Sequence, residues 1–106
     1  MPQVPSLTEQ EMIATILAGE IQLYHELIRP CERSVYLMAL SYMKNEADAE
    51  DVAQEAIVNG FRKLSSFRAE SKFSTWLISI TINEARNRLR RQALVRMESL
   101  DQLDEY

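Results

Sequence analysis

Cationic and aromatic side chains are interleaved along the segment from residue 61 to residue 76. This segment contains Phe61, Arg62, Lys63, Phe67, Arg68, Lys72, Phe73 and Trp76. Cationic groups bind phosphates, and aromatic faces stack on unpaired bases. Burial in a hydrophobic core is the better explanation for Phe61 and Phe73, whereas Phe67 lies in a polar loop, where base stacking explains it at least as well. The segment therefore indicates a surface that binds nucleic acid.

A second group of chemically capable side chains is acidic and consists of Asp48, Glu50, Asp51 and Glu55. Carboxylates bind hard cations, but helical spacing scatters these four around the helix axis, and no loop glycine lies among them. Gly19 and Gly60 are too far apart to form a phosphate-binding loop, and no nucleophile and base surround the only histidine, His25. We therefore expect no metal, no cofactor and no enzymatic activity.

The formal charges divide the chain into three segments. Residues 1–61 carry three basic and ten acidic side chains, residues 62–96 carry nine basic and two acidic ones, and residues 97–106 carry four acidic ones. The overall charge of −4 thus conceals one concentrated basic segment in an acidic protein. Such segregation favours two surfaces with different partners, although solvated faces that happen to cluster explain the charges equally well by themselves.

The chain of 106 residues, 46% of them hydrophobic, is long enough for one domain with its own core. No apolar run approaches the ~18 residues of a membrane span, and residues 1–5 lack the basic start of a secretory signal. The only cysteine, Cys31, excludes an internal disulfide and is best explained as a small buried residue. These observations predict a cytoplasmic protein with no membrane span.

Helical periodicity dominates the first half of the chain. Thr8 and Glu11 form a capping-box pattern, which predicts a short helix over about 9–18 that Gly19 ends. A longer helix follows, with one apolar stripe formed by Ile21, Tyr24, Ile28, Cys31, Val35, Met38 and Tyr42. Pro30 interrupts this stripe, so we expect a kink or two abutting helices there.

Asn45 is a good N-cap for the next helix, which is predicted to run to about Leu64. Its inward-facing residues are predicted to be Val52, Ala53, Ala56, Ile57, Phe61 and Leu64. The polar residues expected on the opposite side are Asp48, Asp51, Gln54, Glu55 and Asn59.

The last long segment is ambiguous, because residues 78–82 alternate as in a strand. No second alternating run could pair with it, so a helix is the better interpretation. Ser74 or Thr75 is expected to cap this helix. Its apolar stripe is predicted to consist of Ile78, Ile82, Ala85 and Leu89, with Trp76, Leu77 and Ile80 widening the first half. The sequence thus predicts an all-α fold, a compact bundle of three main helices plus a short N-terminal one.

Three blocks of sequence carry a family resemblance: residues 48–56 (DAEDVAQEA), 66–77 (SFRAESKFSTWL) and 83–91 (NEARNRLRR), after a helix that contains a proline. In this order and spacing they resemble region two of an extracytoplasmic-function (ECF) bacterial sigma factor. The resemblance covers about residues 20–92 and implies a domain that binds core RNA polymerase and recognises and melts the promoter minus-ten element.

The acidic helix resembles the one that docks on the clamp helices of the polymerase β′ subunit. The matching positions are Asp48, Asp51, Gln54, Glu55 and Asn59. Their carboxylates and amides are suited to charge-assisted hydrogen bonds with arginine-rich partner helices. The resemblance also implies an anti-sigma factor as a further partner.

The basic loop and the last helix resemble the parts that capture a flipped base of the minus-ten non-template strand and read its neighbours. The matching positions are Phe67, Arg68, Lys72, Ser74, Thr75 and Trp76 in the loop region, and Asn83, Arg86, Asn87, Arg90 and Arg91 on the helix. The resemblance assigns phosphate contacts to the last two arginines. Asn87 departs from the acidic residue that many members of the family carry there.

The expected organisation is an N-terminal segment with a short helix (1–19), the sigma region-two domain (20–92) and an acidic linker or tail (93–106). We expect this tail to lead to a second helical domain, which the chain itself does not contain. Two other functions stay open from the residues alone. One is a small helical regulator that binds duplex DNA without polymerase, and the other is a helical protein-interaction module whose basic face meets an acidic partner.

Overall fold

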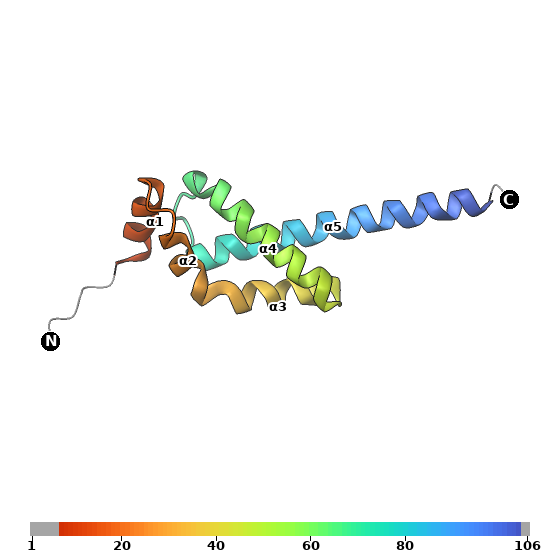
Figure 1. Cartoon of the computed structure of the whole chain (residues 1–106), viewed down its shortest axis with the longest axis horizontal. Helices are drawn as coiled ribbons and strands as arrows, with labels where there is room; N and C mark the ends of the chain where they lie inside the picture. The colour runs from red at the N-terminus through yellow and green to blue at the C-terminus, as the bar shows by residue number, and fades with distance from the viewer. Residues whose placement is uncertain (1–6, 105–106) are drawn as a thin grey trace.

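The computed structural model describes residues 7–104, which fold into helices and short connections (Figure 1). In chain order the elements are α1 (Glu9–Leu17), α2 (Leu23–Ile28), the 3-10 turn η1 (Arg29–Cys31), α3 (Glu32–Met43), α4 (Glu46–Arg62), the 3-10 turn η2 (Leu64–Ser66) and α5 (Phe73–Asp104). No strand occurs in this described range, so the all-α prediction is confirmed. Residues 1–6 of the expected N-terminal segment and residues 105–106 of the expected tail lie outside the described residues.

The predicted capping box starts α1. The Thr8 hydroxyl accepts a hydrogen bond from the Glu11 amide at 3.1 Å and donates one to the Glu11 carboxylate at 3.0 Å. Gly19 follows this helix with a φ of 127°, a conformation that residues with a Cβ rarely adopt, and the chain turns there towards α2. Pro30 lies in η1, so the interruption takes the form of two abutting helices, α2 and α3.

The turn into α4 depends on two adjacent residues. Lys44 ends α3 in the left-handed conformation with a φ of 60°. Asn45 then caps α4 as predicted, because its side-chain oxygen accepts a hydrogen bond from the Asp48 amide at 3.0 Å. Glu46 and Asp48 lie in the first turn, where the positive end of the helix dipole favours carboxylates.

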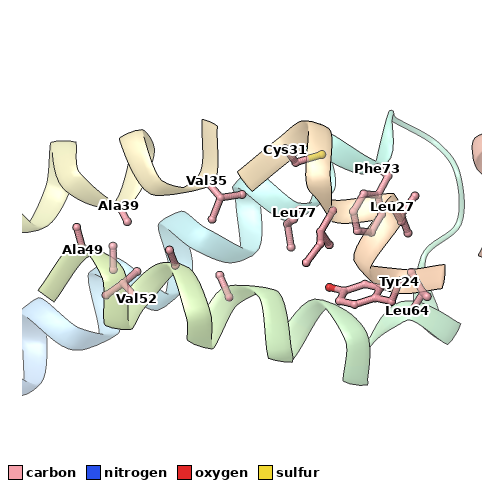
Figure 2. Packing of buried hydrophobic residues seen from close by; sticks show 14 of the residues in the cluster. Tyr24, Leu27, Cys31, Val35, Ala39, Ala49, Val52, Leu64, Phe73 and Leu77 are labelled. Atoms are coloured by element: carbon pink, nitrogen blue, oxygen red, sulfur yellow. The ribbon is translucent and has the colours of Figure 1, made fainter. Parts of the chain in front are cut away.

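The hydrophobic core lies between α3, α4 and α5, with α1 and α2 at one end (Figure 1). The large, fully buried apolar side chains are Val35, Val52, Leu64, Phe73 and Leu77 (Figure 2). Burial of one such side chain stabilises the fold by about 1.5–3 kcal/mol relative to exposure. Ala39 and Ala49 are also fully buried, and their small size allows α3 and α4 to approach closely.

The buried side of α4 differs from the prediction at its C-terminal end. Val52, Ala53 and Ala56 are buried as predicted, but Gly60 is the buried residue of the next turn, and Phe61 is 39% exposed. The Phe61 ring lies edge-on to the Tyr24 ring at 5.1 Å, at the margin of the core. The reason is steric, because the hydroxyl of Tyr24 and the side chain of Leu77 occupy the space next to Gly60.

Tyr24 joins α2 to α4 across this contact. Its hydroxyl donates a hydrogen bond of 2.6 Å to the Ile57 carbonyl. Burial, reinforced by the neighbouring Cys31 thiol, raises the pKa of the Tyr24 phenol well above its usual value of 10, so the group stays protonated and remains a donor. Burial also raises the pKa of the Cys31 thiol, with a smaller contribution from Glu9, which fits the expected role of a small buried residue.

The first backbone amide of α5 is hydrogen-bonded to a side chain that lies far away in the sequence. The Phe73 amide donates a hydrogen bond of 3.0 Å to the Glu9 carboxylate, which comes from the first turn of α1. The expected caps, Ser74 and Thr75, instead lie inside the helix, because α5 begins at Phe73. An anionic acceptor at a helix N-terminus is favoured by the unpaired amides and by the helix dipole.

The buried line of α5 differs from the centre of the predicted stripe. Leu77 and Ala85 are fully buried as predicted, but the third fully buried residue is Thr81, and Ile78 and Ile82 are only half-buried. Leu89, also predicted, is 38% exposed. The buried hydroxyl of Thr81 causes no penalty, since it donates to the Leu77 carbonyl at 2.8 Å.

The expected linker is helical as far as Asp104. The second half of α5 extends beyond the other helices (Figure 1). The side chains from residue 93 to residue 102 are all exposed, Leu94, Val95 and Met97 among them. The segment therefore forms a helix without a partner on the described chain, and its role as an interdomain linker stays a prediction, as do the domain boundaries.

We predict that Gly60→Ala lowers the free energy of unfolding by about 1–3 kcal/mol through overpacking, although alanine has the higher helix propensity. An added Cβ would lie 2.8 Å from both Leu77 Cδ1 and the Tyr24 hydroxyl. Urea unfolding followed by circular dichroism measures the effect. Because Tyr24→Phe removes one of the two atoms, the cost of Gly60→Ala should be smaller in that background. A stabilising Gly60→Ala would contradict this packing.

We predict that Glu9→Ala lowers the free energy of unfolding by about 1 kcal/mol, because the Phe73 amide loses its acceptor. Glu9→Gln keeps an acceptor oxygen and should retain most of that stability. Thermal unfolding of both variants checks the difference, with Glu20→Ala as a control that removes an exposed acidic side chain elsewhere. Equal losses in Glu9→Ala and in the control would show that the contact contributes nothing.

Candidate interfaces for a protein partner and for nucleic acid

The predicted acidic residues gather on one side of α4. Asp48, Asp51 and Glu55 are spaced by three and four residues, so they follow one another along that side. Together with Gln54 and Asn59 they form what we call the acidic surface. Asp51 and Gln54 are exposed, whereas the other three are half-buried beside α5.

Arg88 of α5 lies among the three carboxylates of this surface. Its guanidinium donates to the Glu55 carboxylate at 3.3 Å, and it lies 3.8 Å from one oxygen of Asp48 and from one of Asp51. The Arg88 side chain is 21% exposed, so water screens these attractions less than those of a surface pair. Arg88 therefore offsets part of the repulsion among the carboxylates and holds α5 against α4.

Two further polar pairs join the same helices. The Gln92 amide donates to the Asp48 carboxylate at 3.2 Å, and the Asn59 amide donates to the Glu84 carboxylate. Four of the five predicted docking residues thus already have a partner on α5, namely Asp48, Asp51, Glu55 and Asn59. Gln54 is the member of the surface for which no such pair is found among the described residues.

Sequence reasoning missed Arg88, because it looks like every other basic residue of segment 62–96. One signal could have identified it. Arg88 follows Thr81 by seven residues and Ala85 by three, so it continues the buried line of α5. A charged residue on a buried line needs an opposite charge on the helix that faces it.

A shallow groove of about 560 Å³ opens between α4 and α5 over the acidic surface. Asp51, Gln54 and Glu55 provide acceptors on one wall, and Arg88 lies on the other. Val58, which is 48% exposed, adds an apolar patch. Such a groove suits a long cationic side chain, whose aliphatic stem needs apolar contact and whose head needs carboxylates.

The loop between η2 and α5 contains an aromatic cluster. The centroid of the Phe67 ring lies 5.1 Å from that of Trp76 and 6.1 Å from that of Phe73, which it meets edge to face. Phe73 is fully buried, in agreement with its predicted core role. Phe67 does not stand free in a polar loop as expected; it is half-buried and packs on the core. The physical reason is that contact with two aromatic neighbours removes apolar ring area from water, which is more favourable than leaving the Phe67 ring solvated.

A hollow of about 190 Å³ lies on the outer side of this cluster. Its lining residues are Ser66, Phe67, Arg68, Glu70, Ser71 and Trp76. The neighbouring Ala69 has a φ of 58°, a conformation that costs about 1–2 kcal/mol for a residue with a Cβ. The hollow combines two aromatic rings, Phe67 and Trp76, with one cation, Arg68, and one carboxylate, Glu70. Aromatic rings suit stacking on an unpaired base, and a cation suits the adjoining phosphate.

The other nucleic-acid candidates lie along α5. With about 3.6 residues per turn, Trp76, Asn83 and Arg90 share one side of α5, roughly opposite the buried Thr81 and Ala85. One groove of about 450 Å³ is lined by Ser79, Ile80, Ile82, Asn83 and Arg86. A second, of about 320 Å³, is lined by Glu84, Asn87, Arg90 and Arg91. The aromatic hollow and these two grooves are therefore arranged along the same helix.

Two candidates at the start of α5 are placed differently. Thr75 is exposed, as is Lys72 in the preceding loop, so both are accessible to a ligand. Ser74 is half-buried, and helical geometry puts it on the side of Thr81 rather than on that of Asn83. The structure therefore separates Ser74 from the other helical candidates.

Within residues 7–104, no group of three or more His, Cys, Asp and Glu side chains is arranged to hold a metal ion. No helix in that range combines the length and the apolar character needed to cross a membrane.

The family model for Sigma-70 region 2 matches residues 27–95. The chain is 34% identical over 83 residues to the ECF RNA polymerase sigma-E factor of Escherichia coli strain K12, covering 78% of this chain and 43% of that protein. It is 31% identical over 81 residues to the RNA polymerase sigma-H factor of Pseudomonas aeruginosa, covering 76% of this chain and 42% of that protein. The chain thus spans less than half the length of these curated relatives.

One solved structure shares the fold over most of both chains. It is the NMR structure of an engineered region 2 of sigmaE in complex with GTAAAA, with a TM-score of 0.76 and 32% sequence identity. The match covers 86% of this chain and 95% of that one.

Proposed function

We propose, because this chain belongs to the sigma-70 region 2 family, that it is the part of an ECF sigma factor that binds core RNA polymerase and recognises and melts the promoter minus-ten element. The observation that carries the proposal is the arrangement of an acidic surface on α4 and a basic, aromatic-lined surface on α5. The family consists of transcription initiation factors, and in this role the chain performs no chemistry of its own. Its place of action is the cytoplasm.

The acidic surface is the proposed docking site for the clamp helices of the polymerase β′ subunit. Asp51 and Gln54 are its exposed members, so they are the first groups that a partner meets. Asp48, Glu55 and Asn59 add acceptors and an amide at the rim towards α5. Arginines of a partner helix would bind here through charge-assisted hydrogen bonds, with Val58 against their aliphatic stems.

The hollow at Phe67 and Trp76 is the proposed capture site for one flipped base of the minus-ten non-template strand. Its volume suits one base rather than a base pair. Arg68 and Lys72 provide cations at the loop, and Asn83 and Arg86 follow on α5 for the neighbouring bases. The solved relative is in complex with GTAAAA, which supports an oligonucleotide on the corresponding surface here.

Arg90 and Arg91 are the proposed phosphate contacts beyond the captured base. Both are exposed, and they share a groove with Asn87. Asn87 offers an amide rather than a carboxylate, so it adds no repulsion towards a phosphate in that groove. An anti-sigma factor that regulates the chain would act by covering these surfaces. A regulator that binds only duplex DNA is less well supported, because the hollow has space for unpaired bases.

We predict that Asp51→Ala together with Gln54→Ala weakens binding to core RNA polymerase, with about 1–3 kcal/mol lost for each contact. Both side chains are exposed, so the fold should stay intact. Fluorescence titration of labelled chain with core polymerase measures the affinity. Glu50→Ala, an exposed acid on another side of α4, serves as the control. Unchanged affinity in the double variant would remove the basis for this docking surface.

We predict that the chain binds a single-stranded oligonucleotide containing GTAAAA more tightly than the corresponding duplex. Extrusion of a base from a duplex costs a few kcal/mol, and stacking on an aromatic ring returns only about 1–3 kcal/mol. Fluorescence anisotropy at two salt concentrations, with a shuffled sequence as control, measures both affinities. Equal binding to the duplex and the single strand would contradict base capture.

The same assay separates the reading of bases from the binding of phosphates. Asn83→Ala should reduce discrimination between GTAAAA and the shuffled strand by about 1–3 kcal/mol, because an amide can read base edges. Arg90→Ala should weaken both strands alike and lower the salt slope by about 1. If Arg90→Ala alone abolished the sequence preference, the two roles would be assigned the wrong way round.

A further inference from the structure

Arg88 stands apart from the other arginines of α5. Arg86, Arg90 and Arg91 are exposed on the sides assigned to nucleic acid, whereas Arg88 faces α4 and is largely enclosed. Its guanidinium is directed at the acidic surface, the site where a cationic partner is proposed to dock. Nothing in the proposed reading of DNA uses this side chain.

We propose that Arg88 occupies the polymerase-docking surface within the chain itself. A cationic side chain of the partner must displace Arg88 from Asp51 and Glu55, and Arg88 thereby limits the affinity of docking. This inference rests on the proposed function, because it assigns a regulatory residue to that same surface. In this role Arg88 acts through the carboxylates of α4 as a positioning residue and does not itself contact the partner.

The three attractions of Arg88 are unequal. The pair with Asp51, at 3.8 Å and with the Asp51 side chain 62% exposed, is an exposed ion pair of the kind that contributes little. Glu55, 44% exposed, accepts the hydrogen bond of 3.3 Å, and Asp48, at 3.8 Å, is the most shielded carboxylate at 28% exposed. A competing cation therefore takes Asp51 first and Glu55 at a higher cost, while Asp48 stays beside Arg88.

The fold can tolerate this exchange because other contacts keep α5 in place. Asn59 and Glu84 form a separate hydrogen bond between the same two helices. The buried line of Leu77, Thr81 and Ala85 holds α5 independently of any charge. Movement of one guanidinium thus leaves the α4–α5 packing intact.

Charge and space both allow a competitor. The groove is lined by two arginines, Arg88 and Arg62, and the acidic surface has three carboxylates, so the surface keeps a net negative charge that attracts a further cation. The groove beside Arg88 has about 560 Å³ of open volume next to Asp51 and Gln54. A partner arginine can enter there, but it meets carboxylates that Arg88 has already partly neutralised. Removing the charge of Arg88 should therefore strengthen docking.

The test is the affinity of Arg88→Met for core RNA polymerase, measured at low and at high salt. Methionine keeps an aliphatic stem and removes the charge. The expected result is binding about two- to fivefold tighter than wild type at low salt, with a smaller difference at high salt. Arg96→Met is the matched control, because Arg96 is an exposed arginine of α5 with no salt bridge among the described side chains. The control should not tighten docking.

A purely structural role for Arg88 gives the opposite sign. If Arg88 only holds α5 in place, Arg88→Met binds the polymerase more weakly and melts at a lower temperature, and that result overturns the inference. Should circular dichroism show Arg88→Met to be unfolded, Arg88→Lys decides. A lysine keeps the charge but cannot reach several carboxylates at once, so a smaller gain in affinity is expected. An unchanged or lower affinity of Arg88→Lys would then overturn the inference.

The controls separate this inference from the proposed function. If the wild-type chain fails to bind core polymerase, the proposed function fails and the inference fails with it. If the wild type binds and the Asp51→Ala/Gln54→Ala variant binds weakly, the docking surface stands. An Arg88→Met variant without tighter binding then overturns the role of Arg88 alone.

Discussion

Both charged surfaces depend on how α5 is held between α3 and α4. Leu77, Thr81 and Ala85 have no exposed area, and together they fix which sides of α5 are left for other contacts. The side opposite this line carries the candidates for reading bases. The same side of α5 continues to Arg88, where ion pairs with α4 replace buried apolar contacts. One helix thus supplies core residues, the side proposed to bind nucleic acid and, through Arg88, the partner of the acidic surface, because different sides of the helix serve each purpose.

The start of α5 is determined at a distance. Glu9, 64 residues earlier in the sequence, accepts a hydrogen bond from the Phe73 amide, and the Phe73 ring in turn packs against the rings of Phe67 and Trp76. The loop that forms the aromatic hollow therefore packs against the N-terminus of α5, and Glu9 of α1 caps that N-terminus. A loop anchored by packing and by a cap pays less entropy on binding than a mobile one, which suits capture of a single base. The N-terminal helix α1 thereby supports the proposed nucleic-acid surface without forming part of it.

Opposite charges lie close together in this small domain, and some of them form ion pairs or hydrogen bonds between α4 and α5. The acidic surface and the basic segment are separate in the sequence, yet Arg88 and Gln92 reach Asp48 across the gap between α4 and α5. Exposed residues of the acidic surface such as Asp51 and Gln54 remain accessible to a partner. The more shielded Asp48 is already bound by Arg88 and Gln92. Charge patterning along the chain identified the two surfaces, but it could not tell which carboxylates already had a cation.

The sequence by itself determined the all-α fold, the capping box at Thr8, the N-cap at Asn45 and the interruption at Pro30, because these depend on residues close together along the chain. It also determined the family, through three motifs in fixed order. Tertiary structure alone decided the cap of α5 by Glu9, the full burial of Thr81 rather than of Ile78 and Ile82, and the position of Phe67 on the core. Periodicity shows that a helix has an apolar side, but it does not fix the centre of that side between neighbouring lines such as 77–81 and 78–82, which are about 100° of rotation apart. The helices that pack against α5 choose between them, and that choice also turned Arg88 towards the carboxylates of α4.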